Sequence, residues 1–377
     1  MSTTVPPGVL TVPAEVHGRR LQAMRAEILR LTDEVLSSGV FHGGPRVREL
    51  ERVTGRLWGG HPVGASSGTM ALEAACRALG IGAGDEVIVP ALTFVSTSFA
   101  PAHAGAVPVV ADIDPLTRTL DADAVRAAIT TRTKAVIAVH MCGQCADMTA
   151  LNAIAGQHGL AVIEDCAQAA GATHHGRAAG TLGNIGCFSM WAGKNLGGLS
   201  DAGLLIARDP GMVPLLRQLI DLGRHQDRHV HHVPGHRGRL SELDAAVITH
   251  QLSLLPQWIG QRRDIAAHYN HAFAGLPLQT PDDAPGRPHT YYKYPITLPT
   301  AHEARRLADQ LTAAGITTEQ IYPVLPHQQP AFTRIPHRVA SADHAHDLTT
   351  RTLCLPIAPE LTQPEIDHVT HTVLTCH

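Results

Sequence analysis

The chain has 377 residues, of which 44% are hydrophobic and 17% are charged, and its net charge is −3. This length predicts two domains of roughly 100 to 200 residues each, and the composition excludes a disordered or fibrous protein. The near-neutral charge excludes binding to nucleic acid through a basic surface, so we expect no nucleic-acid partner.

The N-terminal sequence MSTTVPPGVLTVPAEV lacks the basic and then apolar layout of a secretory signal, which predicts a cytoplasmic protein. Seven cysteines, an odd number, are spread along the chain and favour buried thiols over a disulfide framework. The uncharged run from Val87 to Ala111 is long enough to cross a membrane, but its prolines and His103 favour strand, loop, short helix and strand. We therefore expect no membrane partner.

The first functional candidate along the chain is the segment from Ser66 to Thr69, which leads into the amphipathic sequence MALEAACRALG. The free amides at the start of a helix, its dipole and the hydroxyls of Ser67 and Thr69 make an anion site suited to a phosphate. Ordinary N-capping of the helix is the alternative.

Residues 86–209 alternate short β-branched runs with stretches typical of helices. The runs are EVIVP, AVPVVADI, AVIAVH, AVIEDC, CFSM and GLLIARD. This alternation predicts an α/β domain with a largely parallel sheet, and the nearly continuous apolar runs predict strands that are covered on both faces. Ligands of such sheets bind beyond the carboxyl ends of the strands, so polar residues after these runs are the leading functional candidates.

Of the residues that follow these runs, three fit the chemistry of a single cofactor. Phe94 could stack on a flat ring, with a place in the core as the alternative. Asp165 ends a run where a carboxylate could keep a pyridine nitrogen protonated, although it could also cap a helix. Lys194, among the glycines of CFSMWAGKNLGG, could form an imine with a carbonyl compound, whereas an isolated lysine would be a surface charge. Together with the phosphate site, they predict a pyridoxal-phosphate enzyme.

Other reactive residues offer competing interpretations. Lys134 is expected at the surface, and Lys293, within TYYKYPITL, is expected to be structural or to contact substrate. Cys142 and Cys145 have the spacing of a thioredoxin-like redox pair or half of a zinc site, and one such pair alone is weak support for either. The polar, His-rich segment from His225 to Arg239 predicts a loop near the substrate entrance, and its spacing fits no closed metal site.

The remaining elements complete the predicted architecture. A helix follows from Ser241, a strand covers YYKYPITL, and helices are expected at residues 301–314 and 363–374. We divide the chain into a large α/β domain at residues 1–255 and a smaller α+β domain at residues 256–377.

Nine motifs in order resemble the DegT/DnrJ/EryC1/StrS family of pyridoxal-phosphate-dependent sugar aminotransferases. They are SSGTMAL, IVPALTFVSTSFA, VADIDP, VHMCGQCADM, IEDCAQAAGA, GTLGNIGCFSMWAGKNLG, RLSELDAA, IYPVLPHQQPAF and CLPIAPELT. The resemblance covers roughly residues 40–370. It implies the fold-type-I architecture and a homodimer whose active sites lie at the subunit interface.

The resemblance also implies a role for each matching residue. Lys194 would be the Schiff-base lysine and proton carrier, Asp165 would pair with the pyridine nitrogen, and Gln168 would lie near the phenolic oxygen. Ser67, Gly68, Thr69 and Ser189 would hold the phosphate, Phe94 would stack on the ring, and Tyr322, His327 and Arg239 would face the substrate. Where the family usually reads G-x-N-x-R-L, this chain has GHRGRL, so Arg237 replaces the Asn that a partner subunit typically offers to the phosphate.

The expected reaction moves an amino group from L-glutamate or L-glutamine to a keto group of a nucleotide-linked deoxysugar, in secondary-metabolite biosynthesis such as that of antibiotics. Retention of Lys194 favours amino transfer, because the dehydratase branch of the family carries His there. The alternatives are a keto-cyclitol aminotransferase of aminoglycoside biosynthesis, a redox or metal-binding protein that uses Cys142 and Cys145, and a non-catalytic pyridoxal-phosphate sensor.

Overall fold

The computed structural model describes residues 10–225, 227 and 229–376, so most of the stretch considered for a secretory signal lies outside them. Within these residues, eight strands form the main sheet, in the order β1-β9-β8-β5-β4-β2-β3-β11. Neighbours from β8 to β11 pair in parallel, whereas β9 pairs antiparallel with β8 and β1. The predicted α/β class and largely parallel sheet are confirmed. The strands are β1 His61–Ala65, β2 Glu86–Pro90, β3 Val107–Ala111, β4 Thr133–Val139, β5 Ala161–Asp165, β8 Ile185–Ser189, β9 Gly203–Ala207 and β11 Arg338–Val339.

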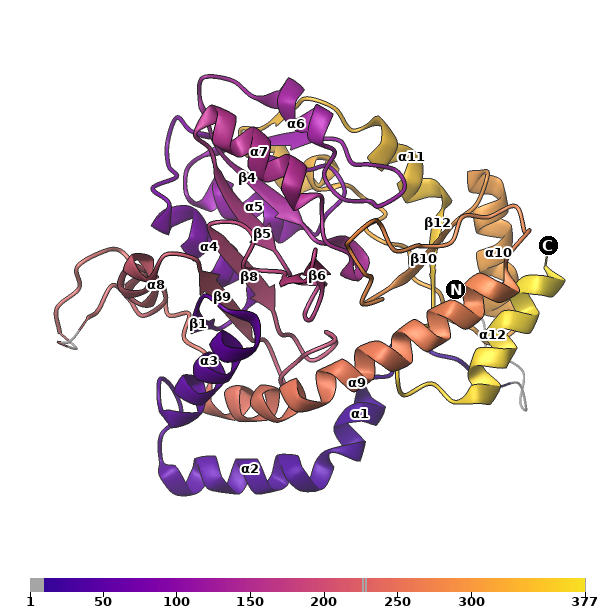
Figure 1. Cartoon of the computed structure of the whole chain (residues 1–377), viewed down its shortest axis with the longest axis horizontal. Helices are drawn as coiled ribbons and strands as arrows, with labels where there is room; N and C mark the ends of the chain where they lie inside the picture. The colour runs from indigo at the N-terminus through magenta and orange to yellow at the C-terminus, as the bar shows by residue number, and fades with distance from the viewer. Residues whose placement is uncertain (1–9, 226, 228, 377) are drawn as a thin grey trace.

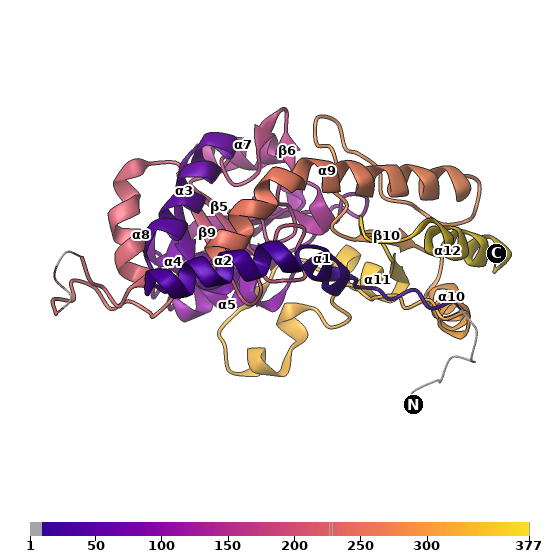
Figure 2. The ribbon, with the colours of Figure 1, turned by 90° about the horizontal axis from the view of Figure 1, so that it is seen from below.

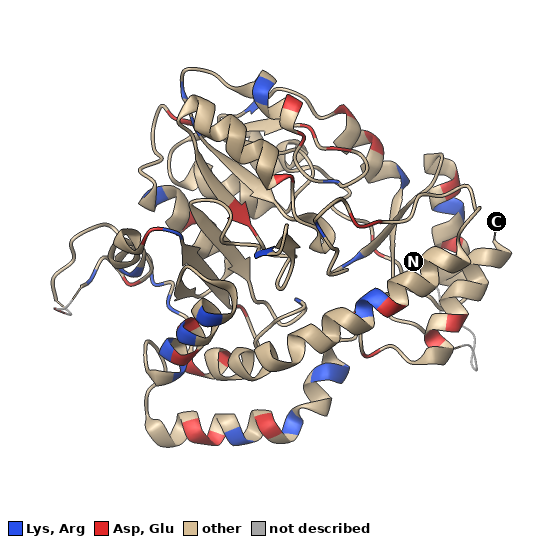
Figure 3. Cartoon of the chain, viewed as in Figure 1, with Lys and Arg blue, Asp and Glu red and all other residues tan. Residues whose placement is uncertain are grey.

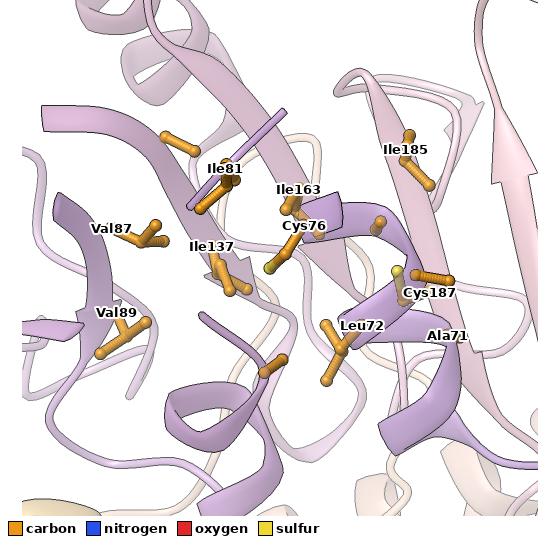
Figure 4. Packing of buried hydrophobic residues seen from close by; sticks show 14 of the residues in the cluster. Ala71, Leu72, Cys76, Ile81, Val87, Val89, Ile137, Ile163, Ile185 and Cys187 are labelled. Carbon is orange, nitrogen blue, oxygen red and sulfur yellow. The ribbon is translucent and has the colours of Figure 1, made fainter. Parts of the chain in front are cut away.

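Helices cover both faces of this sheet (Figure 1), which explains the nearly continuous apolar runs. One face packs against α4 (Gly68–Ala78), α5 (Val95–His103), α8 (Val213–Ile220) and α11 (Asp343–Arg351). Figure 4 shows Leu72 and Cys76 of α4 close to Ile137 and Ile163 of the sheet. The other face packs against α3 (Pro45–Trp58), α6 (Ala122–Ala128), α7 (Met148–His158) and the first part of α9 (Glu242–Ala272).

Two N-terminal helices, α1 (His17–Ala23) and α2 (Arg25–Ser38), lie along the same side of the molecule as α9 (Figure 2). Leu31 of α2 packs against Val247 of α9. Basic and acidic residues alternate along α2 (Figure 3), where Arg30 pairs with Glu27 and Glu34. Helix α9 begins after Ser241, whose hydroxyl accepts a hydrogen bond from the N–H of Asp244, so the predicted helix start is confirmed.

A second hydrophobic core surrounds the antiparallel pair β10 (Tyr294–Thr297) and β12 (Thr352–Leu355). It also contains residues of α10 (Ala301–Ala313), α12 (Gln363–Thr375) and the second part of α9, together with Val12 and Val16 from the N-terminal segment. Helix α9 crosses the proposed division at residue 255 without interruption, and β11, from the C-terminal part, pairs with β3 of the main sheet. The division into two domains remains a prediction.

The described residues of the His-rich segment form no helix and only isolated bridges, which agrees with the predicted loop. It follows α8 and projects from the body of the molecule, at the left of Figure 1. Its described residues are joined to the chain by isolated bridges between Asp221 and Arg237 and between Arg224 and His231. A short hairpin, β6 (Thr173–His174) and β7 (Arg177–Ala178), lies elsewhere. Among the described residues, no helix combines the length and apolarity that crossing a membrane requires.

Candidate active site

The carboxyl ends of several strands meet the start of α4 at one edge of the sheet. β5 ends at Asp165, β8 ends at Ser189, and β1 ends at Ala65, shortly before α4 begins. Gly203, at the start of β9, pairs with both Ala65 and Ser189, so these ends are aligned. A cavity of about 410 Å³ opens at this edge. It is lined by nine predicted site residues, Ser67, Gly68, Thr69, Phe94, Asp165, Gln168, Ser189, Lys194 and Tyr322.

Close packing shapes the part of the cavity beside α4. A Cβ atom on Gly68 would lie 2.7 Å from Cβ of Ser189, and one on Gly203 would lie 2.4 Å from the backbone carbon of Ser67. Only glycine therefore lets the start of α4 approach β8 and β9 this closely. Ser67 Oγ accepts from the N–H of Met70 at 3.1 Å, so the capping alternative is also realised. Oγ1 of Thr69 shares a hydrogen bond with Oγ of Ser96 at 2.7 Å. The N–H groups at the start of α4 and the hydroxyls beside them are donors that a phosphate could accept from.

Asp165 is buried at the base of the cavity. Its Oδ2 accepts a hydrogen bond from Oγ1 of Thr97 at 2.8 Å, and its Oδ1 accepts one from the N–H of Ala167 at 3.1 Å. Burial raises the pKa of Asp165, and these two hydrogen bonds and the charge of Lys194 oppose that rise. A carboxylate in this state is poised to pair with a cationic group inside the cavity.

Lys194 lies in the irregular loop between β8 and β9. The N–H of Lys194 donates to the carbonyl of Trp191 at 2.8 Å, which closes a turn and directs the side chain to the cavity. Its Nζ lies 3.4 Å from Oη of Tyr292 and 4.6 Å from the centre of that ring. Lys194 is thus the amine that the chain brings into the same cavity as Asp165.

A directed chain of hydrogen bonds crosses the cavity wall. The N–H of Cys142 donates to Oε1 of Gln168 at 2.7 Å, and Nε2 of Gln168 donates to Oη of Tyr322 at 2.7 Å. Because Tyr322 Oη accepts from Gln168, its own hydrogen is available to an acceptor in the cavity. Burial raises the pKa of Tyr322 well above its ordinary value, so the hydroxyl stays protonated. Phe94, 55% exposed, stands 6.0 Å from the Tyr322 ring.

The model of the DegT/DnrJ/EryC1/StrS aminotransferase family matches residues 22–374. The chain belongs to this family. It is 40% identical to the UDP-N-acetyl-3-dehydro-alpha-D-glucosamine 3-aminotransferase of Acidithiobacillus ferrooxidans, in an alignment of 348 residues that covers 92% of each chain. It is 37% identical to the dTDP-3-amino-3,4,6-trideoxy-alpha-D-glucose transaminase of Streptomyces venezuelae, in an alignment of 346 residues that covers 91% of this chain and 90% of that protein.

Solved structures share this fold. DesV of Streptomyces venezuelae, in complex with a ketimine intermediate, superposes with a TM-score of 0.91 at 36% identity over 96% of this chain and 97% of that one. NtdA of Bacillus subtilis, with bound pyridoxamine phosphate, gives a TM-score of 0.90 at 27% identity over 99% of this chain and 86% of that one. The chain is a pyridoxal-phosphate-dependent aminotransferase, as the sequence motifs predict.

The residues of the cavity fit pyridoxal phosphate. Gly68 and Gly203 let the start of α4 pack closely against β8 and β9, and Ser67, Thr69 and Ser189 line the cavity there with hydroxyls that can donate to a phosphate. Burial raises the pKa of Asp165, so a protonated ring nitrogen is the kind of partner that offsets this burial. Lys194 supplies the amine that an aldehyde requires. The cavity therefore offers a group of suitable chemistry to each of three parts of the cofactor, its phosphate, its ring nitrogen and its aldehyde.

Three predicted residues do not line this cavity. Arg237 is exposed in the projecting loop, and Arg239 forms an ion pair with Asp221 at 3.2 Å. His327 lies in a short 3-10 turn at residues 326–328, and burial lowers its pKa. The competing lysine, Lys293, pairs with Glu319 and Glu15 outside the cavity.

The residues on which the redox and metal-binding interpretations depend are buried within the protein. Cys142 and Cys145 are both buried free thiols, and burial raises the pKa of Cys142 to about 11 and that of Cys145 still further. Thiols held protonated in this way are poor nucleophiles and poor metal ligands. His140, Glu164 and Cys166 lie close enough to hold a metal ion, but Glu164 already accepts several hydrogen bonds from the protein.

Several residues of the site were not predicted from the sequence. Thr97, in the first turn of α5, orients Asp165, and Tyr292 contacts Lys194 from a segment 98 residues away. The position of Thr97, three residues after Phe94 at a strand end, could have drawn attention to it. No local pattern marks Tyr292, because only the fold brings its segment to the cavity.

Proposed function

We propose that the enzyme transfers an amino group from L-glutamate or L-glutamine to a keto group of a nucleotide-linked deoxysugar, in the biosynthesis of a secondary metabolite such as an antibiotic. The observation that carries the proposal is that Lys194 and Asp165 line the same cavity as the hydroxyl residues at the start of α4 and the end of β8, which are Ser67, Thr69 and Ser189. Both relatives named above are aminotransferases of nucleotide-linked sugars, one UDP-linked and one dTDP-linked, which supports this class of acceptor.

Each cavity group has a proposed role in holding the cofactor. Ser67, Thr69 and Ser189, with the amide of Gly68, bind the phosphate, and Phe94 stacks on the ring. Asp165 pairs with the ring nitrogen and keeps it protonated. Gln168 faces the phenolic oxygen, because its Nε2 has a second hydrogen beyond the one given to Tyr322.

When bound, pyridoxal phosphate supplies an electron sink for the carbon that loses or gains the amino group. Nζ of Lys194 removes a proton from the amino-bearing carbon of the donor and later returns one to the former carbonyl carbon of the acceptor. The hydroxyl of Tyr322 donates a hydrogen bond to the substrate. The cavity walls hold these groups in place, so that donor and acceptor react at one site in turn.

We also propose a homodimer with shared active sites. Arg237 and Arg239 lie on or next to the exposed loop that projects from the body, outside the cavity of their own chain. In a dimer, this loop would bring Arg237 to the phosphate and Arg239 to the substrate of the partner subunit. Mixing Lys194→Ala with Arg237→Ala tests this, because only a shared-site dimer regains activity when its subunits exchange. His327, from the loop that contains Tyr322, would face the sugar.

A substrate panel tests the proposed reaction. The purified enzyme with pyridoxal phosphate is given L-glutamate or L-glutamine and, in parallel, a dTDP-linked keto-deoxysugar, a UDP-linked keto sugar and a keto-cyclitol, and aminated products are identified by mass spectrometry. We expect amination of a nucleotide-linked sugar and none of the cyclitol, with Lys194→Ala as the inactive control. Amination of the cyclitol alone would replace this proposal, and consumption of neither donor nor acceptor would favour a non-catalytic sensor.

A further inference from the structure

The short helix α1 lies against the loop that contains Lys194. Arg20 of this helix is only 5% exposed, and its guanidinium lies 5.3 Å from the ring centre of Trp258 in α9. The neighbouring His17 ring stands 5.7 Å from that of Trp191, at the start of the loop. Figure 2 shows α1 and α2 passing along the same side of the molecule as α9.

Arg20 binds three backbone carbonyls of the loop. Its Nη2 donates to the carbonyl of Ala192 at 2.8 Å and to that of Lys194 itself at 3.0 Å, and its Nη1 donates to that of Asn195 at 3.2 Å. A planar guanidinium presents several N–H groups in a fixed fork, so one side chain can fix three carbonyls in a defined geometry. These contacts join residues about 175 positions apart.

The loop depends on such partners because it has no regular structure from Trp191 to Gly198. A buried carbonyl without a hydrogen bond costs free energy, and neither a helix nor a sheet supplies donors here. On the far side of the loop, Asp244 of α9 accepts from the N–H groups of Leu199 at 2.8 Å and Ser200 at 3.2 Å. Arg20 thus holds the carbonyls near the lysine, and Asp244 holds the amides that follow.

The surroundings of Arg20 show that its position is unfavourable for a charged group, because burial removes the guanidinium from water. Burial lowers its pKa, and Glu360, the nearest carboxylate, lies 3.9 Å from its Nε, beyond direct hydrogen-bond distance. Its Nε has no hydrogen-bond partner among the described residues. The hydrogen bonds of this buried cation therefore go to the loop carbonyls, and Glu360 adds an ion pair at longer range.

We propose that Arg20 is a positioning residue that fixes the backbone of the loop and thereby aims Nζ of Lys194 into the cavity. The proposal rests on the proposed function only in taking Lys194 as the reacting amine. It assigns the N-terminal helix to the active site, although no residue of α1 lines the cavity.

Three variants test this role. Arg20→Met removes the charge and the fork, and Arg20→Lys keeps the charge but replaces the fork with a single ammonium. Arg19→Met is the matched control, because Arg19 lies on the same helix and pairs with Glu365 at 2.7 Å, away from the loop. Hydrogen exchange of the amides at residues 191–200 is measured in the full chain with and without pyridoxal phosphate, beside kcat, the KM for the donor and the absorbance of the lysine-bound cofactor.

We expect exchange in the loop to rise at least about tenfold in Arg20→Met, since all three hydrogen bonds from the guanidinium are lost. Arg20→Lys should restore little of the protection, kcat should fall in both variants with little change in KM, and Arg19→Met should match the wild type. Wild-type exchange in Arg20→Lys, or equal loosening in Arg19→Met and Arg20→Met, would overturn the proposal. If Arg20→Met does not fold, Arg20→Lys decides. Because exchange needs no substrate, a loosened loop in an enzyme that aminates no sugar would refute only the proposed function.

Discussion

Two neighbouring carboxylates of β5 show how the same chemistry serves as scaffold or as site. Glu164 and Asp165 are both buried, and they point to opposite faces because side chains alternate along a strand. Glu164 Oε2 accepts from Nε2 of His140 at 2.9 Å. Its two oxygens also accept from three backbone N–H groups, those of Gly180, Leu182 and Gly183 at 2.7 to 2.8 Å.

Among the residues that the structure describes, Asp165 accepts only two hydrogen bonds, and it lines the cavity. Glu164, whose oxygens are fully hydrogen-bonded, holds together the loop before β8. Asp165 can still accept further hydrogen bonds from a partner outside the described chain. The tautomer of His140 agrees with this division, because its Nδ1 accepts from the N–H of Ala146 and leaves Nε2 to donate to Glu164. Spare hydrogen-bonding capacity, rather than burial, distinguishes the functional carboxylate.

The largest effect should come from the amine opposite Asp165. Lys194→Ala should abolish the violet absorbance of the lysine-bound cofactor and lower turnover by several orders of magnitude, because no other lysine of the described residues lines the cavity. Lys293→Ala is the control and should keep that absorbance, since Lys293 pairs with Glu319 outside the cavity. The reverse pattern of spectra would mean that the wrong lysine has been assigned.

On the functional side of the comparison, Asp165→Asn should lower kcat about 100- to 1000-fold while the protein stays folded, because an amide cannot stabilise a protonated ring nitrogen. Steady-state kinetics with the donor half-reaction would measure the fall. Thr97→Val is the matched variant, since it removes one hydrogen bond to Asp165 and keeps the charge, and it should have a much smaller effect. Equal losses in both variants would show that geometry, not charge, is what Asp165 provides.

On the scaffold side, Glu164→Gln should lower the free energy of unfolding by about 2–3 kcal/mol, because an amide group would face N–H donors that now meet a carboxylate. Urea denaturation would measure the loss. The kcat of the folded enzyme should stay unchanged, since Glu164 does not line the cavity. A large fall in kcat with unaltered stability would reverse the roles assigned to these two carboxylates.

Much of this architecture was predictable from sequence, for an identifiable physical reason. Strands covered on both faces leave continuous apolar runs, and the parallel order then brings the residues after those runs to one edge. Asp165 and Lys194 could be found because each follows such a run, and the segment from Ser67 to Thr69 could be found because it leads into an amphipathic helix. The helix start at Ser241 could likewise be predicted from the apolar spacing of the residues that follow it.

Other features depend on contacts that no local pattern encodes. In sequence, Glu164 and Asp165 are simply adjacent acids, and only the loop at residues 180–183 makes one of them structural. Arg20 is one of 27 arginines, and its hold on the lysine loop depends on how α1 is placed against α9. The sequence also did not indicate that β9 runs antiparallel within an otherwise mostly parallel sheet.

The smallest effect concerns pH and the cofactor-free protein. Burial raises the folded-state pKa of Asp165 above its unfolded value, so the folded state holds this proton more tightly. The free energy of unfolding should therefore fall as the pH rises through the interval between the two values, and the loss should persist at neutral pH. Asp165→Asn should remove this contribution and be slightly more stable than the wild type near pH 7, although it is less active.

Urea denaturation of both cofactor-free proteins between about pH 4 and about pH 8 would measure this difference in the free energy of unfolding. Bound pyridoxal phosphate should cancel the difference by supplying the cationic partner. A wild type whose stability parallels that of the variant at every pH would mean that Asp165 is already satisfied by the chain, which would remove the distinction from Glu164.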